Sequence, residues 1–233
     1  MKASALLLSA VVLTACASER PSFERTGQIA PGGALTVVNS RGNVSVFAPS
    51  VGQPKSQWTF QAFGPGTVRV VQRGNVVRID TPQGGNVREL VRSPKGVTLN
   101  VSTHDGALHV EDVDSMVNAT DVNGDIKMLV PEYANAKTDV GNISVIFGST
   151  TWGGTLHFST RKGDVELYVN ENAAARLHLH TDHGTIFTDF PLHGSSHGTS
   201  ETIDAPINGG ASRAIDVRVR DGSIRVLQLK PQI

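Results

Sequence analysis

Histidines in the C-terminal half of the chain are the residues whose types and spacing best suit metal chemistry. His178 and His180 alternate along one segment, Asp182 follows, and His157 lies upstream in a similar segment. If these segments are neighbouring strands, His157 and His178 are outward neighbours, and imidazoles at that spacing with Asp182 could bind Zn²⁺. No cysteine pair or His-Glu-x-x-His motif accompanies them. The pattern therefore fits an exposed polar face better, and we expect neither a metal nor another cofactor.

A serine and several aspartates are the candidates for catalysis. The segment Gly194–Gly198 matches the G-x-S-x-G elbow of hydrolases, but Pro191 precedes it and no helix can follow, so the match is interpreted as chance. Acid–base chemistry on surface polysaccharide or peptidoglycan is the alternative function. Its candidate carboxyl groups fit corner residues as well, and we therefore expect no catalytic residue; they are Asp125, Asp139, Asp164 and Asp182.

The N-terminus carries the most specific motif of the chain. Lys2 precedes a short apolar run that is well below the about 20 residues of a membrane-spanning helix, as in a secretory signal peptide. The segment Leu13-Thr14-Ala15-Cys16 resembles the bacterial lipobox. That resemblance implies a lipoprotein signal peptide at 1–15, a lipidated Cys16 and a tether over 16–32. Because Ala17 follows, Gram-negative sorting rules imply a lipid anchor in the outer membrane of the cell envelope.

Composition narrows the classes of function. The 233 residues include 21 Lys and Arg against 21 Asp and Glu, so a chain-wide electrostatic attraction to nucleic acid is excluded. Aromatic residues make up only 5%, which leaves few platforms for stacking on bases or sugars. Cys16 is the one cysteine, so the fold has no internal disulfide.

One short pattern recurs along the chain: a strand-like segment, a glycine corner and a second strand-like segment. Aliphatic residues occupy fixed positions before and after each glycine, and spacings near 20 residues suit the coils of a solenoid. The sequence therefore predicts a mainly β, single-stranded parallel β-solenoid with degenerate coils. An antiparallel β-sandwich is the alternative. The corner glycines are Gly42, Gly106, Gly124, Gly141, Gly163, Gly184 and Gly222.

Polar residues recur three positions before the corner glycine, on the side of the strand predicted to face inward. Their hydroxyls could bond backbone groups freed by the corner, so they are predicted to be structural and not ligands. The tight corner often needs a left-handed backbone with positive φ, which glycine adopts readily. Asn or Asp next to the glycine is interpreted as tolerating the same conformation. The predicted threonine ladder consists of Thr103, Thr138, Thr160 and Thr181.

Two regions are distinguished within the mature chain. Residues 33–97 are predicted to form an N-terminal β cap or first coils, with a hairpin at Gly74-Asn75 between alternating runs. Residues 98–233 are predicted to hold the solenoid repeats.

The corner motifs resemble those of the bacterial putative-adhesin family of unknown function. The residues that carry the resemblance include the first corner, 37–44, and the later corner 160–165. The resemblance implies an envelope-located β-solenoid and supplies no catalytic residue. We therefore expect a lipid-anchored, non-catalytic protein for binding, adhesion or scaffolding. Its expected partners are the membrane, through Cys16, and an envelope or surface macromolecule, and not nucleic acid.

Overall fold

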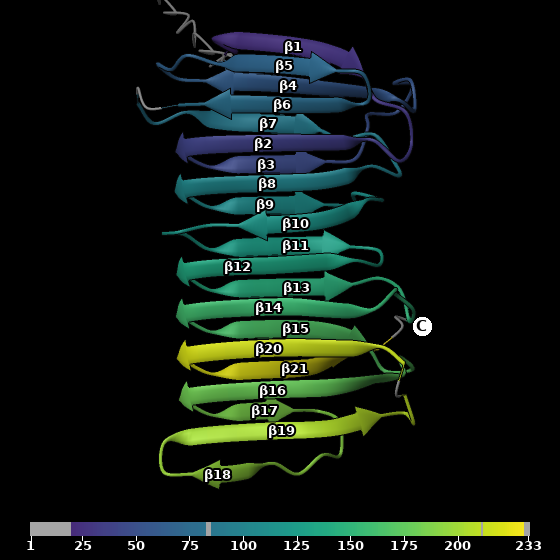
Figure 1. The fold of residues 1–233 in the computed structure, drawn as a ribbon, viewed down its shortest axis with the longest axis vertical. Coiled ribbons are helices and arrows are strands. Elements are labelled where there is room, and N and C mark those ends of the chain that lie inside the picture. The colour runs from purple at the N-terminus through teal and green to yellow at the C-terminus, as the bar shows by residue number, and fades with distance from the viewer. Residues whose placement is uncertain (1–19, 83–84, 211, 231–233) are drawn as a thin grey trace, which may run out of the picture.

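The computed structural model describes residues 20–82, 85–210 and 212–230, and every regular element in these ranges is a β-strand. The strands stack into a long, flattened solenoid (Figure 1) built from ten-stranded sheet A and eleven-stranded sheet B. The predicted parallel β-solenoid is confirmed, and the antiparallel β-sandwich is wrong. No helix in the described ranges could cross a membrane. Residues 1–15 and Cys16 lie outside them.

Each coil consists of a strand of sheet B, a tight corner and a strand of sheet A. The coils pair in parallel with their neighbours along both sheets. In spatial order they are β6 (Val76–Thr81) with β7 (Arg88–Arg92), β2 (Ala34–Arg41) with β3 (Val44–Phe47), β8 (Thr98–Asp105) with β9 (Leu108–Glu111), β10 (Met116–Thr120) with β11 (Ile126–Val130), β12 (Ala134–Val140) with β13 (Ile143–Phe147), β14 (Thr155–Lys162) with β15 (Val165–Asn170), β20 (Ala214–Asp221) with β21 (Ile224–Leu229), and β16 (Ala175–His183) with β17 (Ile186–Thr188).

Antiparallel strands cover both ends of the stack. At the N-terminal end, β1 (Phe23–Gln28) pairs with β4 (Gln57–Phe63), and β5 (Arg69–Arg73) forms a hairpin with β6 through Gly74-Asn75. At the other end, β19 (Ser200–Ile207) pairs with β16, and short β18 (Ser195–His197) pairs with β19. Short or charged strands at a sheet edge hinder pairing with another chain, which explains this arrangement.

The spatial order of the coils departs from the order of the sequence at both ends. The last coil, β20–β21, lies between β14–β15 and β16–β17, and β2–β3 lies between β6–β7 and β8–β9 (Figure 1). At the C-terminal end the chain skips one position, builds the end coil and its cap, and then fills the skipped position with β20–β21. At the N-terminal end it builds β2–β3 first, then the end coil β6–β7 with its cap strands, and continues past β2–β3 to β8. Strands β14 and β16 are therefore not neighbours.

Side chains at the predicted inward positions form the core. Leu35, Leu99 and Leu156 are examples of the column seven residues before the glycine, and all are fully buried. The aliphatic column two residues after the glycine is buried as well, except at Ile186 in the short end strand β17. Because side chains alternate along each strand, one face of each sheet packs into the core and the other face points outward.

Close backbone contact between neighbouring coils requires the corner glycines. A Cβ atom on Gly124 would overlap the carbonyl oxygen of Gly106, and one on Gly184 would overlap that of Gly222, although neither glycine has a left-handed backbone. The corner glycines therefore stack directly on one another. The Asn and Asp residues that follow them do not have positive φ, so that part of the interpretation is wrong. Instead, Asp125 Oδ1 accepts the backbone N–H of Asn142 in the next coil at 2.8 Å.

The predicted threonine ladder lies buried at the corners. Each threonine hydroxyl donates to a glycine carbonyl oxygen of the neighbouring coil, at 3.2 Å from Thr103, 3.2 Å from Thr138, 3.0 Å from Thr160 and 2.8 Å from Thr181. The acceptors are Gly42, Gly124, Gly141 and Gly222. A buried carbonyl without a donor is costly, so these bonds join the coils at their tightest point.

Candidate functional site

The predicted histidine site is not assembled as expected. Because β20 separates β14 from β16, Asp216 is in register with both His157 and His178. The Nδ1 atom of His157 lies 3.7 Å from Asp216, whereas His178 Nδ1 lies 3.1 Å from Asp204 on β19. His180 contacts Asp182 at 3.0 Å and Thr202 at 2.9 Å. The expectation that His157 and His178 are direct neighbours is wrong, and within the described ranges no three His, Cys, Asp or Glu side chains are grouped to hold a metal ion.

The other candidates for chemistry have structural surroundings. Ser196 lies exposed in edge strand β18 and not on a turn between a strand and a helix. Asp125 accepts a backbone N–H from the next coil, and Asp164 does the same for Ser223 at 2.7 Å. Asp139 and Asp182 instead lie on the outward face of sheet B, where they flank a groove.

The outward face of sheet B carries rows of side chains in register along the solenoid axis. Asn118 donates to Asn100 at 3.0 Å, Asn135 donates to Asn118 at 3.0 Å, and the backbone N–H of His157 donates to Asn135 at 2.9 Å. Asp216, His178 and Asp204 continue this row. The residues of such a row occupy paired positions on neighbouring strands, and neighbouring strands are about 4.8 Å apart.

A shallow groove of about 430 Å³ lies on this face across β12, β14, β20 and β16, and we call it the C-terminal groove. One row along it holds Lys137, Ser159, Arg218 and His180, in register on the four strands. Two residues further along each strand, a second row holds Asp139, Arg161, Arg220 and Asp182. Three arginines thus lie on the two middle strands, Lys137 lies on β12 at one edge of the groove, and carboxylates flank the second row.

Ion pairing leaves part of this positive charge free. Arg218 is paired with Asp216 through two nitrogen–oxygen contacts at 3.1 and 3.3 Å, and Arg220 forms a longer contact of 3.8 Å with Asp221. Lys137 and Arg161 form no ion pair with any residue in the described part of the chain. Arg161 also stands beside Arg220 on the adjacent strand, between the paired positions Thr160–Val219 and Lys162–Asp221. Like charges on neighbouring strands repel, so an anion placed between them would relieve the repulsion.

Sequence reasoning found His180 and Asp182 of this groove but not its cations. Lys137 and Arg218 each lie four residues before a corner glycine. Arg161 and Arg220 each lie two residues before one. The aligned columns could have shown four basic residues at two outward levels. Their adjacency, however, depends on the insertion of β20 between β14 and β16.

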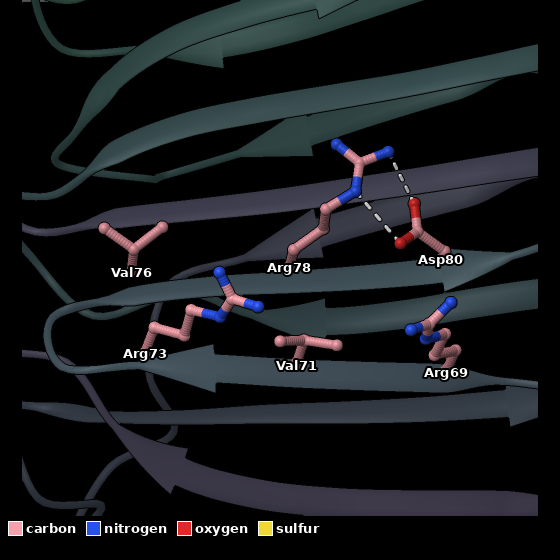
Figure 2. A pocket seen from close by; sticks show the side chains of 6 residues that line it. All are labelled: Arg69, Val71, Arg73, Val76, Arg78 and Asp80. Atoms are coloured by element: carbon pink, nitrogen blue, oxygen red, sulfur yellow. Dashed lines mark hydrogen bonds and ion pairs between the residues drawn. The ribbon is translucent and has the colours of Figure 1, made fainter.

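A second groove, of about 400 Å³, lies on sheet B at the N-terminal end, and we call it the arginine groove. Its lining residues are Arg69, Val71, Arg73, Val76, Arg78 and Asp80 from the hairpin β5–β6. Figure 2 shows these side chains rising from the two strands, with contacts drawn only between Arg78 and Asp80. The two Arg78–Asp80 contacts measure 2.9 and 2.6 Å.

Two carboxyl groups are buried inside the solenoid. Glu89 is in register with Val44, at a level where the other coils carry aliphatic residues, and none of it is exposed. Burial raises its pKa to about 7. The Thr81 hydroxyl is near enough to offset part of this rise, although the two groups do not reach hydrogen-bonding geometry. Asp121 occupies a threonine-ladder position, and burial raises its pKa to about 6.

At the C-terminal end of the outward face of sheet B, neighbouring cationic groups lower the pKa of an exposed carboxyl group, that of Asp204. The hydrogen bond from Arg176 to Asp204, at 2.6 Å, is the main reason that the pKa of Asp204 lies below its usual range. His178 contributes to the same effect. Asp204 therefore stays ionised and holds the Arg176 and His178 side chains at the edge of the face.

Comparison with solved structures finds matches at low sequence identity that cover most of the chain. A putative cell adhesion protein from Clostridium sporogenes has 10% identity and a TM-score of 0.49, covering 90% of this chain and 100% of that chain. A putative adhesin from Bacteroides fragilis has 12% identity and a TM-score of 0.44, covering 89% of this chain and 99% of that one. No curated protein matches the chain in sequence.

The family comparison covers most of the solenoid. The model of the family described as Toastrack DUF4097 matches residues 34–227, which run from the start of β2 into β21. The match therefore includes every coil and both groove regions. Because this match spans well over half of the sequence, the chain belongs to the Toastrack DUF4097 family.

Proposed function

We propose that the protein is a lipid-anchored, non-catalytic component of the bacterial cell envelope that binds an anionic envelope polymer through the C-terminal groove. The observation that carries the binding role is the pair Arg161 and Arg220, like charges on adjacent strands beside the unpaired Lys137. Guanidinium groups donate to carboxylate and phosphate in paired, charge-assisted hydrogen bonds.

The shape of the face favours an extended ligand over a small enclosed one. The C-terminal groove is shallow and opens onto a continuous row of polar side chains that follows the solenoid axis. A polymer with regularly spaced carboxylates or phosphates would meet donors on successive strands. The stack of coils fixes the spacing of the strands that carry these donors, so the backbone needs no reordering when the ligand binds, which lowers the entropic cost of binding.

Binding is tested with polygalacturonate, which carries a carboxylate on each sugar, against neutral dextran. We expect the Arg161→Ser/Arg220→Ser variant to lose at least about tenfold in affinity for polygalacturonate, because charge-assisted hydrogen bonds contribute about 1.5–3 kcal/mol each. The matched control is Arg69→Ser/Arg73→Ser, which removes the same charge from the same sheet at the other end. Equal losses in both variants, or equal binding of dextran, would contradict the proposal.

The anchor is tested separately in cells. The lipobox resemblance of Leu13–Cys16 supports lipidation of Cys16 and a place in the outer membrane. We expect the wild-type chain to fractionate with the outer membrane and the Cys16→Ala variant to be lost from it. Protease added to intact cells, and then to cells with a permeabilised outer membrane, shows which side the solenoid faces. Unchanged fractionation of Cys16→Ala would refute the anchor but not the groove.

A further inference from the structure

We propose that the arginine groove binds anionic phospholipid headgroups, so that the N-terminal end of the solenoid lies against the membrane that holds the anchor. This inference rests on the lipid anchor proposed for Cys16. The groove contains three guanidinium groups and one carboxylate. Arg78 is paired with Asp80, whereas Arg69 and Arg73 have no ion-pair partner among the described residues.

Charge complementarity points to a local site and not to general attraction. The formal net charge of the chain is zero, so the molecule as a whole is not drawn to an anionic surface. The excess of arginine in this groove is therefore a local feature that a phosphate layer would recognise. Arginine suits that role because its planar donors match two oxygens of one phosphate.

Apolar side chains between the arginines fit the boundary between headgroups and acyl chains. Val71 lies between Arg69 and Arg73 along β5, and Val76 on β6 is 52% exposed. Figure 2 shows both valines on the same side of the hairpin as the arginines. Cations next to exposed aliphatic groups are typical of surfaces that rest in a membrane interface, whereas a soluble polyanion gains nothing from the valines.

The path of the chain places the groove near the anchor. Arg69 on β5 pairs with Asp80, close to the corner between β6 and β7. Phe23 at the start of β1 pairs with Ala62, which in turn pairs with Glu89 near the start of β7. Strand β1 therefore begins at the same corner. Gln72 on β5 donates to the Gln28 carbonyl at the end of β1, at 2.8 Å.

The covalent distance from this corner to the anchor is short. Ser22 is held at the corner by hydrogen bonds to Ala62 and Gly64, at 3.0 and 2.9 Å. Cys16 is six positions before Ser22 in sequence, which limits the distance between them to about 20 Å. A lipid on Cys16 would therefore keep the arginine groove within reach of the bilayer surface.

The test measures vesicle binding without the lipid. The protein is residues 16–233 with Cys16→Ala, which retains every strand because the first begins at Phe23. Vesicles of equal parts phosphatidylglycerol and phosphatidylcholine are compared with phosphatidylcholine alone by co-sedimentation. We expect binding only to the anionic vesicles, and a loss of about 30-fold in Arg69→Ser/Arg73→Ser, because each arginine near an anionic surface contributes about 1 kcal/mol. Raising the salt from about 0.1 M to about 1 M should also weaken binding.

The matched control is Arg161→Ser/Arg220→Ser, which should retain anionic-vesicle binding to within about threefold. Equal losses in the two variants, or binding to neutral vesicles, would overturn the proposal. It would also be overturned if Arg69→Ser/Arg73→Ser self-associates but binds vesicles normally, since the arginines would then only protect an edge strand. Circular dichroism verifies the fold of both variants. Failure of lipidation in cells does not affect this assay, so the two proposals can fail independently.

Discussion

Glu89 should make the fold less stable as pH rises through neutrality. Its carboxyl group is completely buried, and neither oxygen has a hydrogen-bond partner among the described residues. Burial raises the folded-state pKa from 4.5 to about 7. Between these values the folded state binds more protons than the unfolded state, so the free energy of unfolding falls as pH increases.

The size of this effect follows from the shift in pKa. A rise of about 2.5 units corresponds to about 3.5 kcal/mol, because one unit is about 1.4 kcal/mol. This penalty is absent at about pH 4, where the carboxyl group is protonated in both states, and complete at about pH 8.5. Glu89→Leu places an aliphatic side chain at the level where Val44 and Leu108 already stand. The Glu89→Gln variant keeps the shape of the side chain but cannot ionise.

Urea unfolding at both pH values measures the difference. Relative to the wild type, both variants should gain about 3.5 kcal/mol more at pH 8.5 than at pH 4, since pH effects from all other groups cancel in the comparison. Glu24→Gln on exposed strand β1 is the control and should show no such change. If the advantage of both Glu89 variants is the same at the two pH values, the carboxyl group is not buried as the structure shows.

Three further changes test how neighbouring coils are joined. Asp121→Thr should restore the threonine ladder and stabilise the fold by about 2 kcal/mol at pH 8, with a smaller gain below about pH 6, where the carboxyl group is protonated; thermal unfolding at both pH values checks this. Gly124→Ala should destabilise the fold by more than about 3 kcal/mol, because its Cβ would overlap the Gly106 carbonyl oxygen, whereas Gly153→Ala has open space and should change urea stability by less than about 1 kcal/mol. Asn118→Ala breaks hydrogen bonds to both Asn100 and Asn135 and should cost about 1–2 kcal/mol in the same assay, and an unchanged midpoint would show that the outward ladder does not join the coils.

Local pattern was enough to predict the coil. Alternation of Leu35, Val37 and Asn39 before Gly42 predicted which side chains face inward, and the same register held in later coils. The reason is that strand periodicity and tight corners depend on neighbours in sequence. The conformational role assigned to Asn and Asp after the glycine was wrong, because their side chains bond to the next coil, which a single repeat does not reveal.

Tertiary structure decided which coils are neighbours. The sequence suggested that His157 and His178 are adjacent, but β20 lies between their strands and replaces a histidine pair with His157–Asp216. The same insertion brings Arg161 next to Arg220 and creates the C-terminal groove.

The sequence by itself therefore determined the coil, its corner and its inward faces, because these follow from side-chain alternation and the size of glycine. It did not determine the order of the coils. All coils share similar strands and corners, so many pairings satisfy the same local rules, and covering the ends of the stack selects among them. The C-terminal groove depends on that selection, since β20 must lie between β14 and β16, whereas the arginine groove is formed by the local hairpin β5–β6.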